Sequence, residues 1–120
     1  IAKPTGVVQN DLMIVNIASR GNNIAPISSG WTLLRSSALG GSTIRFGSVL
    51  YKIAGASEPA SYTFALGTGS TGGAGAILAF SGVDVTNPFD VSPGTIASGS
   101  TTAVSASAIT WMMMKALPIN

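Results

Sequence analysis

The sequence contains no cysteine and no histidine. Without cysteine the chain has no disulfide and no thiolate, and its redox compartment cannot be read from the sequence. Without histidine it lacks the usual general base and the usual transition-metal ligand. Its many serines therefore have no histidine to activate them as nucleophiles. We expect no catalytic residue, no cofactor and no enzymatic activity.

Charged side chains are also scarce, at 8% of the 120 residues against roughly 25% in typical soluble domains. The six cations are scattered, and no two are adjacent: Lys3, Arg20, Arg35, Arg45, Lys52 and Lys115. Nucleic-acid binding needs a clustered basic face that neutralises several phosphates together. No apolar run approaches the roughly 18 residues of a membrane span. We therefore expect neither nucleic-acid binding nor membrane insertion.

Only four carboxylates are present: Asp11, Glu58, Asp84 and Asp90. Glycoside hydrolysis needs two of them held across a cleft, and Asp84 and Asp90 are close enough in sequence to meet. The alternative is that both accept backbone N–H groups in turns, as aspartate commonly does. Asp84, Asn87 and Asp90 are hard oxygen donors, which makes them weak candidates for calcium, but their spacing matches no calcium-loop signature.

Short apolar runs broken by Gly, Pro, Asn and Ser predict an all-β protein. Asp11–Ser19 is apolar on both faces, and Thr43–Ala54 alternates in side-chain type. Ser61–Leu66 is enriched in aromatic residues, which favours a half-buried strand. Turn signals recur every 8–15 residues, and no stretch has the spacing of an amphipathic helix. We predict one antiparallel β-sandwich, jelly-roll-like, over residues 1–110.

The stretch Phe64–Phe80 contains Gly67, Gly69 and Gly72 at the spacing G-x-G-x-x-G. A dinucleotide-binding turn with this spacing also needs a helix that starts at the third glycine, then a second strand with an acidic residue. Further glycines in the first turn of that helix, and Pro88 before Asp90, argue against it. We predict instead a hairpin, in which "SYTFAL" and "AGAILAFSG" pair across a flexible loop.

Aromatic residues are few, and two of them are candidates for surface binding. Trp31 and Tyr62 could stack on a sugar ring or contact a receptor. The alternative is that they belong to the core, as aromatic residues on strands usually do.

The last ten residues, Trp111–Asn120, read "WMMMKALPIN" and match neither the strand period nor the helix period. One hypothesis is that the sandwich is incomplete at its C-terminus, because the reading frame is truncated or shifted near Trp111. The rival is a hydrophobic segment that docks on a neighbouring chain, since Met-rich segments are adaptable contacts and open sheet edges pair readily.

Four phrases together resemble a domain of bacteriophage tail and virion structural proteins, and they cover residues 3–90. They are "KPTGVVQNDLMIVNIA", "GWTLL", "YKIAGASEPASYTF" and "GAILAFSGVDVTNPFD". The resemblance implies a β-sandwich in a tail fibre or another surface appendage, with no catalytic residues to carry over.

On this resemblance we expect a non-enzymatic structural module for assembly or surface display, located on a virion or an extracellular surface. Its partners would be further copies of the chain or other virion proteins, and a glycan or receptor is a further candidate. The alternative is a secreted bacterial carbohydrate-binding or adhesin module. Glycan binding that is lost in Trp31→Ala or Tyr62→Ala would favour that alternative.

Overall fold

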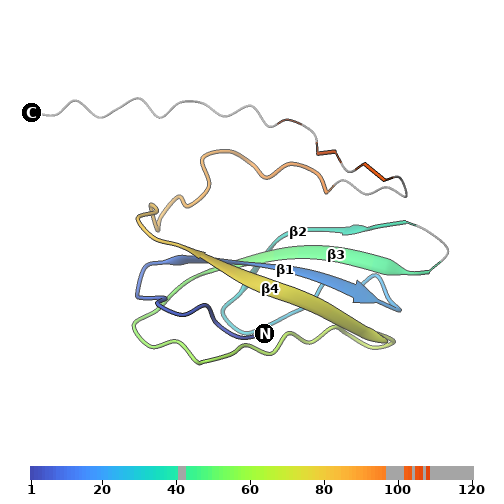
Figure 1. Ribbon diagram of the computed structural model, residues 1–120, viewed down its shortest axis with the longest axis horizontal. Helices are drawn as coiled ribbons and strands as arrows, with labels where there is room; N and C mark the ends of the chain where they lie inside the picture. Colours follow the sequence, from blue (N-terminus) through green and yellow to red (C-terminus); the bar gives the residue numbers. More distant parts are fainter. Residues whose placement is uncertain (41–42, 97–101, 104, 107, 109–120) are drawn as a thin grey trace, which may run out of the picture.

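Four β-strands form one sheet in the computed structural model, which describes residues 1–40, 43–96, 102, 103, 105, 106 and 108 (Figure 1). The strands are β1 (Leu12–Arg20), β2 (Thr32–Ala38), β3 (Arg45–Ile53) and β4 (Gly72–Phe80). The described residues contain no helix. The all-β prediction is confirmed.

The sheet is antiparallel throughout, in the order β2-β3-β1-β4. β1 is paired along all nine residues with β3 on one side and with β4 on the other. β2 and β4 are the edge strands, and the pairing of β2 with β3 shifts register between Leu33 and Arg35. The predicted boundaries of the first and third strands agree with the structure to within two residues.

One face of the sheet carries the core. Successive side chains of a strand point to opposite faces, and in β1 the odd-numbered residues Met13, Val15 and Ile17 are at most 2% exposed. They pack with Leu50 of β3 and Ile77 of β4. The apolar run in β1 thus supplies the centre of the core.

A second layer covers this face, but it is built from loops rather than strands. Isolated bridges join Ala2 to Ser61 and Ile27 to Ala65. The N-terminal ammonium of Ile1 donates to the Tyr62 carbonyl at 2.7 Å, and the Tyr62 N–H donates to the Ile1 carbonyl at 2.8 Å. The predicted strand over residues 61–66 is therefore only a bridged segment. The described residues do not form the second sheet of a sandwich.

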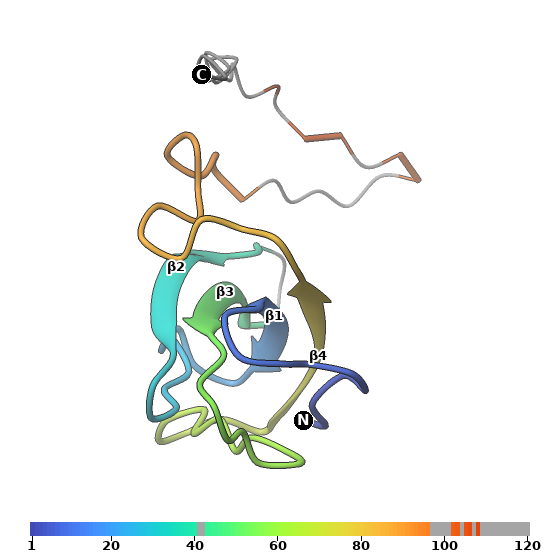
Figure 2. The ribbon, with the colours of Figure 1, turned by 90° about the vertical axis from the view of Figure 1, so that its left-hand side faces the viewer.

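The predicted hairpin is wrong, because β4 pairs with β1 and not with the segment 61–66. That segment lies in the covering layer, and the chain then crosses to the sheet at Gly67–Thr71 (Figure 2). Gly67, Gly69 and Gly72 have positive φ angles of 80°, 85° and 138°, which glycine adopts without a steric cost. A strand begins at Gly72 where a dinucleotide-binding turn needs a helix. These three glycines allow the chain to turn from the covering layer into the sheet.

The opposite face of the sheet is only partly covered, by residues 83–96 after β4 (Figures 1 and 2). Phe89 packs edge-to-face on Tyr51 with ring centroids 4.9 Å apart. The Arg35 guanidinium donates to the Pro93 carbonyl at 2.7 Å and to the Gly94 carbonyl at 3.3 Å. These contacts hold the segment over β2 and β3.

Beyond that segment the structure describes little of the chain. Residues 102, 103, 105, 106 and 108 do not lie in a strand. The tail Trp111–Asn120, and with it the hypotheses of a truncated frame or a docking segment, lies outside the described residues.

We predict that Trp31→Ala lowers the free energy of unfolding by about 3–5 kcal/mol, because it removes a buried aromatic ring from between Tyr62 and Phe64. The matched control is Leu33→Ala, two residues along the chain, where the side chain is 44% exposed and the loss should be about 1 kcal/mol or less. Urea denaturation measures both. Equal losses in the two variants would contradict the assignment of Trp31 to the core.

Candidate functional site

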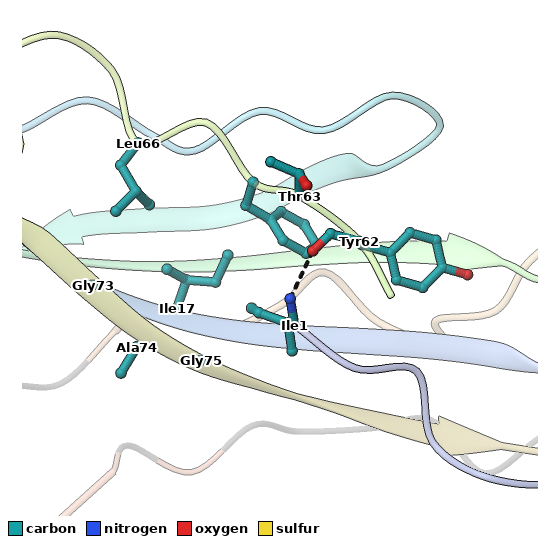
Figure 3. A pocket seen from close by; sticks show the side chains of 9 residues that line it. Ile1, Ile17, Tyr62, Thr63, Leu66, Gly73, Ala74 and Gly75 are labelled. Carbon is teal, nitrogen blue, oxygen red and sulfur yellow. Dashed lines mark hydrogen bonds between the residues drawn. The ribbon is translucent and has the colours of Figure 1, made fainter. Parts of the chain in front are cut away.

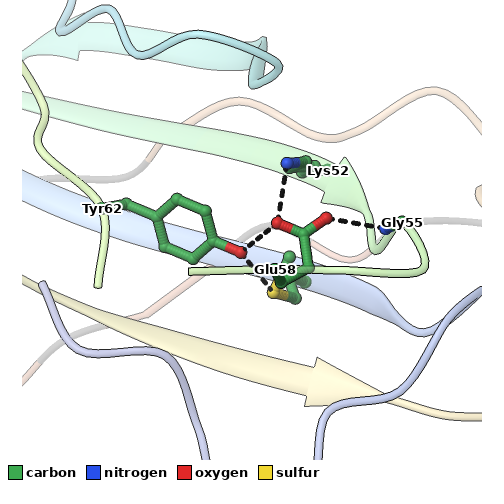
Figure 4. A network of polar contacts seen from close by, with 5 residues as sticks. Lys52, Gly55, Glu58 and Tyr62 are labelled. Carbon is green, nitrogen blue, oxygen red and sulfur yellow. Dashed lines mark hydrogen bonds and ion pairs between the residues drawn. The ribbon is translucent and has the colours of Figure 1, made fainter. Parts of the chain in front are cut away.

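The strongest polar cluster surrounds Glu58, in the turn that follows β3 (Figure 4). One carboxylate oxygen, Oε2, accepts from Lys52 Nζ at 2.8 Å and from the Tyr62 hydroxyl at 2.6 Å. The other oxygen, Oε1, accepts from the Gly55 N–H at 2.6 Å. Pro59 follows directly and keeps the backbone of Glu58 out of the helical region. The carboxylate thereby joins the end of β3, its own turn and the covering layer.

The environment shifts the pKa of two groups in this cluster. Burial alone would raise the pKa of Glu58, but the hydrogen bonds from Lys52, Tyr62 and the Gly55 amide outweigh it and lower the pKa from 4.5 to about 2. Burial raises the pKa of the Tyr62 hydroxyl, and its hydrogen bond to the Glu58 anion raises it further. Both shifts favour a carboxylate anion beside a neutral phenol.

This arrangement suits a structural tie better than proton transfer. A general base needs a pKa near the operating pH, and the Glu58 carboxylate is too acidic for that. The side chain is 6% exposed and three donors already occupy it. Lys52 Nζ also lies 5.5 Å from the centre of the Tyr62 ring, a cation–π contact that adds to the tie.

The two aromatic residues predicted as surface contacts lie in the core. Trp31 is 9% exposed and Tyr62 is 7% exposed. Their rings pack edge-to-face at 5.1 Å, and the Tyr62 hydroxyl lies 3.7 Å from the Met13 sulfur. Stacking on a sugar needs an open ring face. The structure thus favours the core alternative for both residues.

The calcium candidates sit in the exposed segment after β4. Asp84 Oδ1 accepts from the Thr86 N–H at 2.9 Å and from the Asn87 N–H at 3.3 Å. This is the turn role that the sequence left open for Asp84. Asn87 and Asp90 are exposed, and the described residues contain no group of three or more acidic side chains gathered as for a metal. The calcium site at Asp84, Asn87 and Asp90 stays a prediction.

A pocket of about 260 Å³ opens between the first half of β4 and the covering layer (Figure 3). Its apolar walls include Ile1, Ile17 and Leu66, and its floor is Gly73–Gly75. A Cβ on Gly75 would lie 2.6 Å from the Asn16 carbonyl oxygen, so this position tolerates no side chain without backbone movement. Gly73 and Gly75 are needed for this close packing.

A second pocket of about 310 Å³ lies beside the same end of β4, with Ala18, Leu39 and Ala74 as apolar walls. Arg20 and Arg45, which also line it, are directly opposite each other on β1 and β3. Like charges in this position disfavour the pairing. Sequence reasoning missed the pair, because the two arginines are distant in the chain and meet only through the register of the strands.

Sequence reasoning also missed the exposure of β4. Leu78 is 63% exposed and Phe80 is 45% exposed, although both lie on a strand next to the central one. The sequence does show one unusual feature of this strand: its residues change from glycine and alanine to isoleucine, leucine and phenylalanine along its length.

The Glu58 cluster makes stability dependent on acid pH. A lowered pKa means that the fold stabilises the anion, so the contribution is full above about pH 4.5 and is lost as the pH falls towards 2. We predict that Glu58→Gln is less stable than the wild type by about 1–3 kcal/mol at pH 7, and that this gap closes towards pH 2. Urea denaturation at pH 7, 4 and 2 measures it. Asp90→Asn, which changes an exposed carboxylate outside the cluster, is the control. A gap that is constant with pH would contradict the ionic tie.

The described residues contain no helix that is long and apolar enough to cross a membrane. Comparisons of the chain with protein-family models, with curated proteins and with solved structures found no match.

Proposed function

We propose that the chain is a non-enzymatic structural module of a phage-like virion or tail appendage, which serves assembly or surface display. The proposal rests on the four phrases that resemble phage tail and virion proteins. These phrases contribute to all four strands and to the turn that holds Glu58. They supply structural elements, as the resemblance implies.

The observation that carries the proposal is the use of the carboxylates. Asp11 accepts from the Val8 N–H at 3.0 Å, Asp84 accepts two N–H groups of its own turn, and Glu58 ties two layers together. Three of the four carboxylates in the chain thus hold backbone or side-chain donors in place. Such an assignment supports a passive module, because acid–base chemistry needs a carboxylate that is free to exchange protons with a substrate.

The alternative is a secreted carbohydrate-binding or adhesin module, and the burial of its two predicted contact residues weakens it. Trp31 and Tyr62 would have to leave the core before either could stack on a sugar. Any glycan contact would instead use exposed loop residues, among them Ser29 next to Gly30 and Thr68 next to Gly67.

We predict that peptides of this chain occur in phage-like particles from the organism that carries the gene. A DNA-damaging agent would be used to induce particle production, and density-gradient fractions would be analysed by mass spectrometry. The chain should co-sediment with the other particle proteins at a constant ratio, and an abundant cytosolic enzyme is the control.

Detection of the chain only in particle-free medium would contradict this proposal. A glycan array separates the alternative: specific binding by the particle-free protein would support an adhesin. Because Trp31→Ala disturbs the core, the array should compare the wild type with Ser29→Ala and Thr68→Ala, which alter exposed loops.

A further inference from the structure

β4 is an edge strand whose side chains change in size along its length. Its first five residues, Gly72–Ala76, are all glycine or alanine. The last four, Ile77–Phe80, include isoleucine, leucine and phenylalanine. The strand carries no charge and no proline.

The outer edge of β4 is open to another strand. Within the part of the chain that the structure describes, the only strand partner of β4 is β1, and no further backbone hydrogen bond to residues 73–80 occurs. Proteins usually protect an edge with charges, proline or a bulge. β2, the other edge, has both Arg35 and a bulge beside it, whereas β4 has none of these. β4 is therefore the edge that can accept a strand.

We propose that β4 pairs antiparallel with β4 of a second copy of the chain, about a two-fold axis through Ala76. Ala76 is the midpoint of the strand, so this register pairs all nine residues of each copy. The two four-stranded sheets then become one continuous sheet. A two-fold interface of this kind needs a surface that is complementary to itself.

The size gradient of β4 supplies that complementarity. In this register Leu78 lies opposite Ala74 of the second copy, and Phe80 lies opposite Gly72. The even-numbered residues all point to the same face, so each large side chain meets a small one on its own side of the sheet. That face bears the 310 Å³ pocket beside Gly72 and Ala74. Leu78 and Phe80, now 63% and 45% exposed, would find an apolar wall there.

The charges near β4 are compatible with this pairing. Gly72 pairs with Arg20, which pairs with Arg45, so each arginine pair lies near one end of the strand. The two Gly72 ends of the dimer are about 27 Å apart, well beyond the roughly 10 Å over which exposed charges interact at ordinary salt. Gly72 has no side chain to separate Arg20 from Phe80 of the second copy, which allows a favourable guanidinium–ring contact. The inference does not depend on the proposed function, because it uses the geometry of β4 alone.

A cysteine pair tests the register. The chain has no cysteine of its own, so a single introduced residue reports one position. In Ala76→Cys the two equivalent residues face each other with Cα atoms about 4.5–5.5 Å apart, within the range of a disulfide. In the control Ala74→Cys they are offset by four residues, about 13 Å along the strand, and cannot be bridged. We expect a disulfide-linked dimer from Ala76→Cys under mild oxidation and none from Ala74→Cys.

A charge substitution tests the contact itself. Light scattering of the wild type, from about 1 to 500 µM, should show a monomer–dimer equilibrium. Leu78→Lys should abolish the dimer, because it places a charge against the apolar wall of the partner. Leu33→Lys is the matched control, since Leu33 is 44% exposed and lies on β2, at the opposite edge of the sheet from β4, and it should leave the dimer intact.

Three results would overturn the proposal. The first is a wild type that stays monomeric over the whole concentration range. The second is cross-linking of Ala74→Cys as efficient as that of Ala76→Cys, which indicates another register or random collision. The third is a dimer that withstands Leu78→Lys or is lost in Leu33→Lys, which places the contact elsewhere. None of these results bears on whether the chain occurs in virus particles.

Discussion

The pairing of β1 on both of its edges is the constraint on which the rest of the structure depends. All nine residues of β1 are in register with β3 and with β4, so one strand fixes the position of two others. The alternation of its side chains between the two faces then determines which face carries the core, with Met13, Val15 and Ile17 buried. The same register places Arg20 between Arg45 and Gly72. A shift of one residue would turn the buried set to the other face, which makes this register costly to change.

The covering layer needs a different source of order, because it has almost no strand pairing. Two isolated bridges and the bonds between Ile1 and Tyr62 are the main backbone links in this layer. Aromatic packing of Trp31 and the buried Glu58 carboxylate add what a second sheet would otherwise supply. A buried carboxylate stabilises only when its donors are in place, so Lys52, Gly55 and Tyr62 have to be positioned together. The turn before Pro59 does this locally, within a few residues of β3.

The sequence allowed the all-β class and the strands β1 and β3 to be predicted, because both have long apolar or alternating runs. It did not allow the partner of β4 to be predicted, since glycine and alanine carry no pattern that selects one neighbour over another. A hairpin with residues 61–66 is the pairing nearest along the chain, whereas in the structure β4 pairs with the distant strand β1. The same limit applies to Arg20 and Arg45, which become neighbours only through the sheet. Trp31 and Tyr62 have ring systems that suit both a core and a binding surface, and the covering layer, which the sequence did not predict, buries them.

The glycine-rich stretch that resembles a nucleotide-binding turn has two structural tasks instead. Gly67 and Gly69 carry the chain from the covering layer to the sheet with positive φ angles. Gly73 and Gly75 let the sheet approach Leu66 and Ile1, where a Cβ would lie 2.9 Å and 3.0 Å from their side chains. These packing demands exclude a side chain at the core-facing positions of Gly73 and Gly75, while Ile77 of the same strand fills the core. The other face of β4 has small residues at one end, Gly72 and Ala74, and the exposed Leu78 and Phe80 at the other. Because small and large residues stand at opposite ends, this face of β4 is complementary to its own antiparallel copy, while the core face is committed to the packing of the monomer.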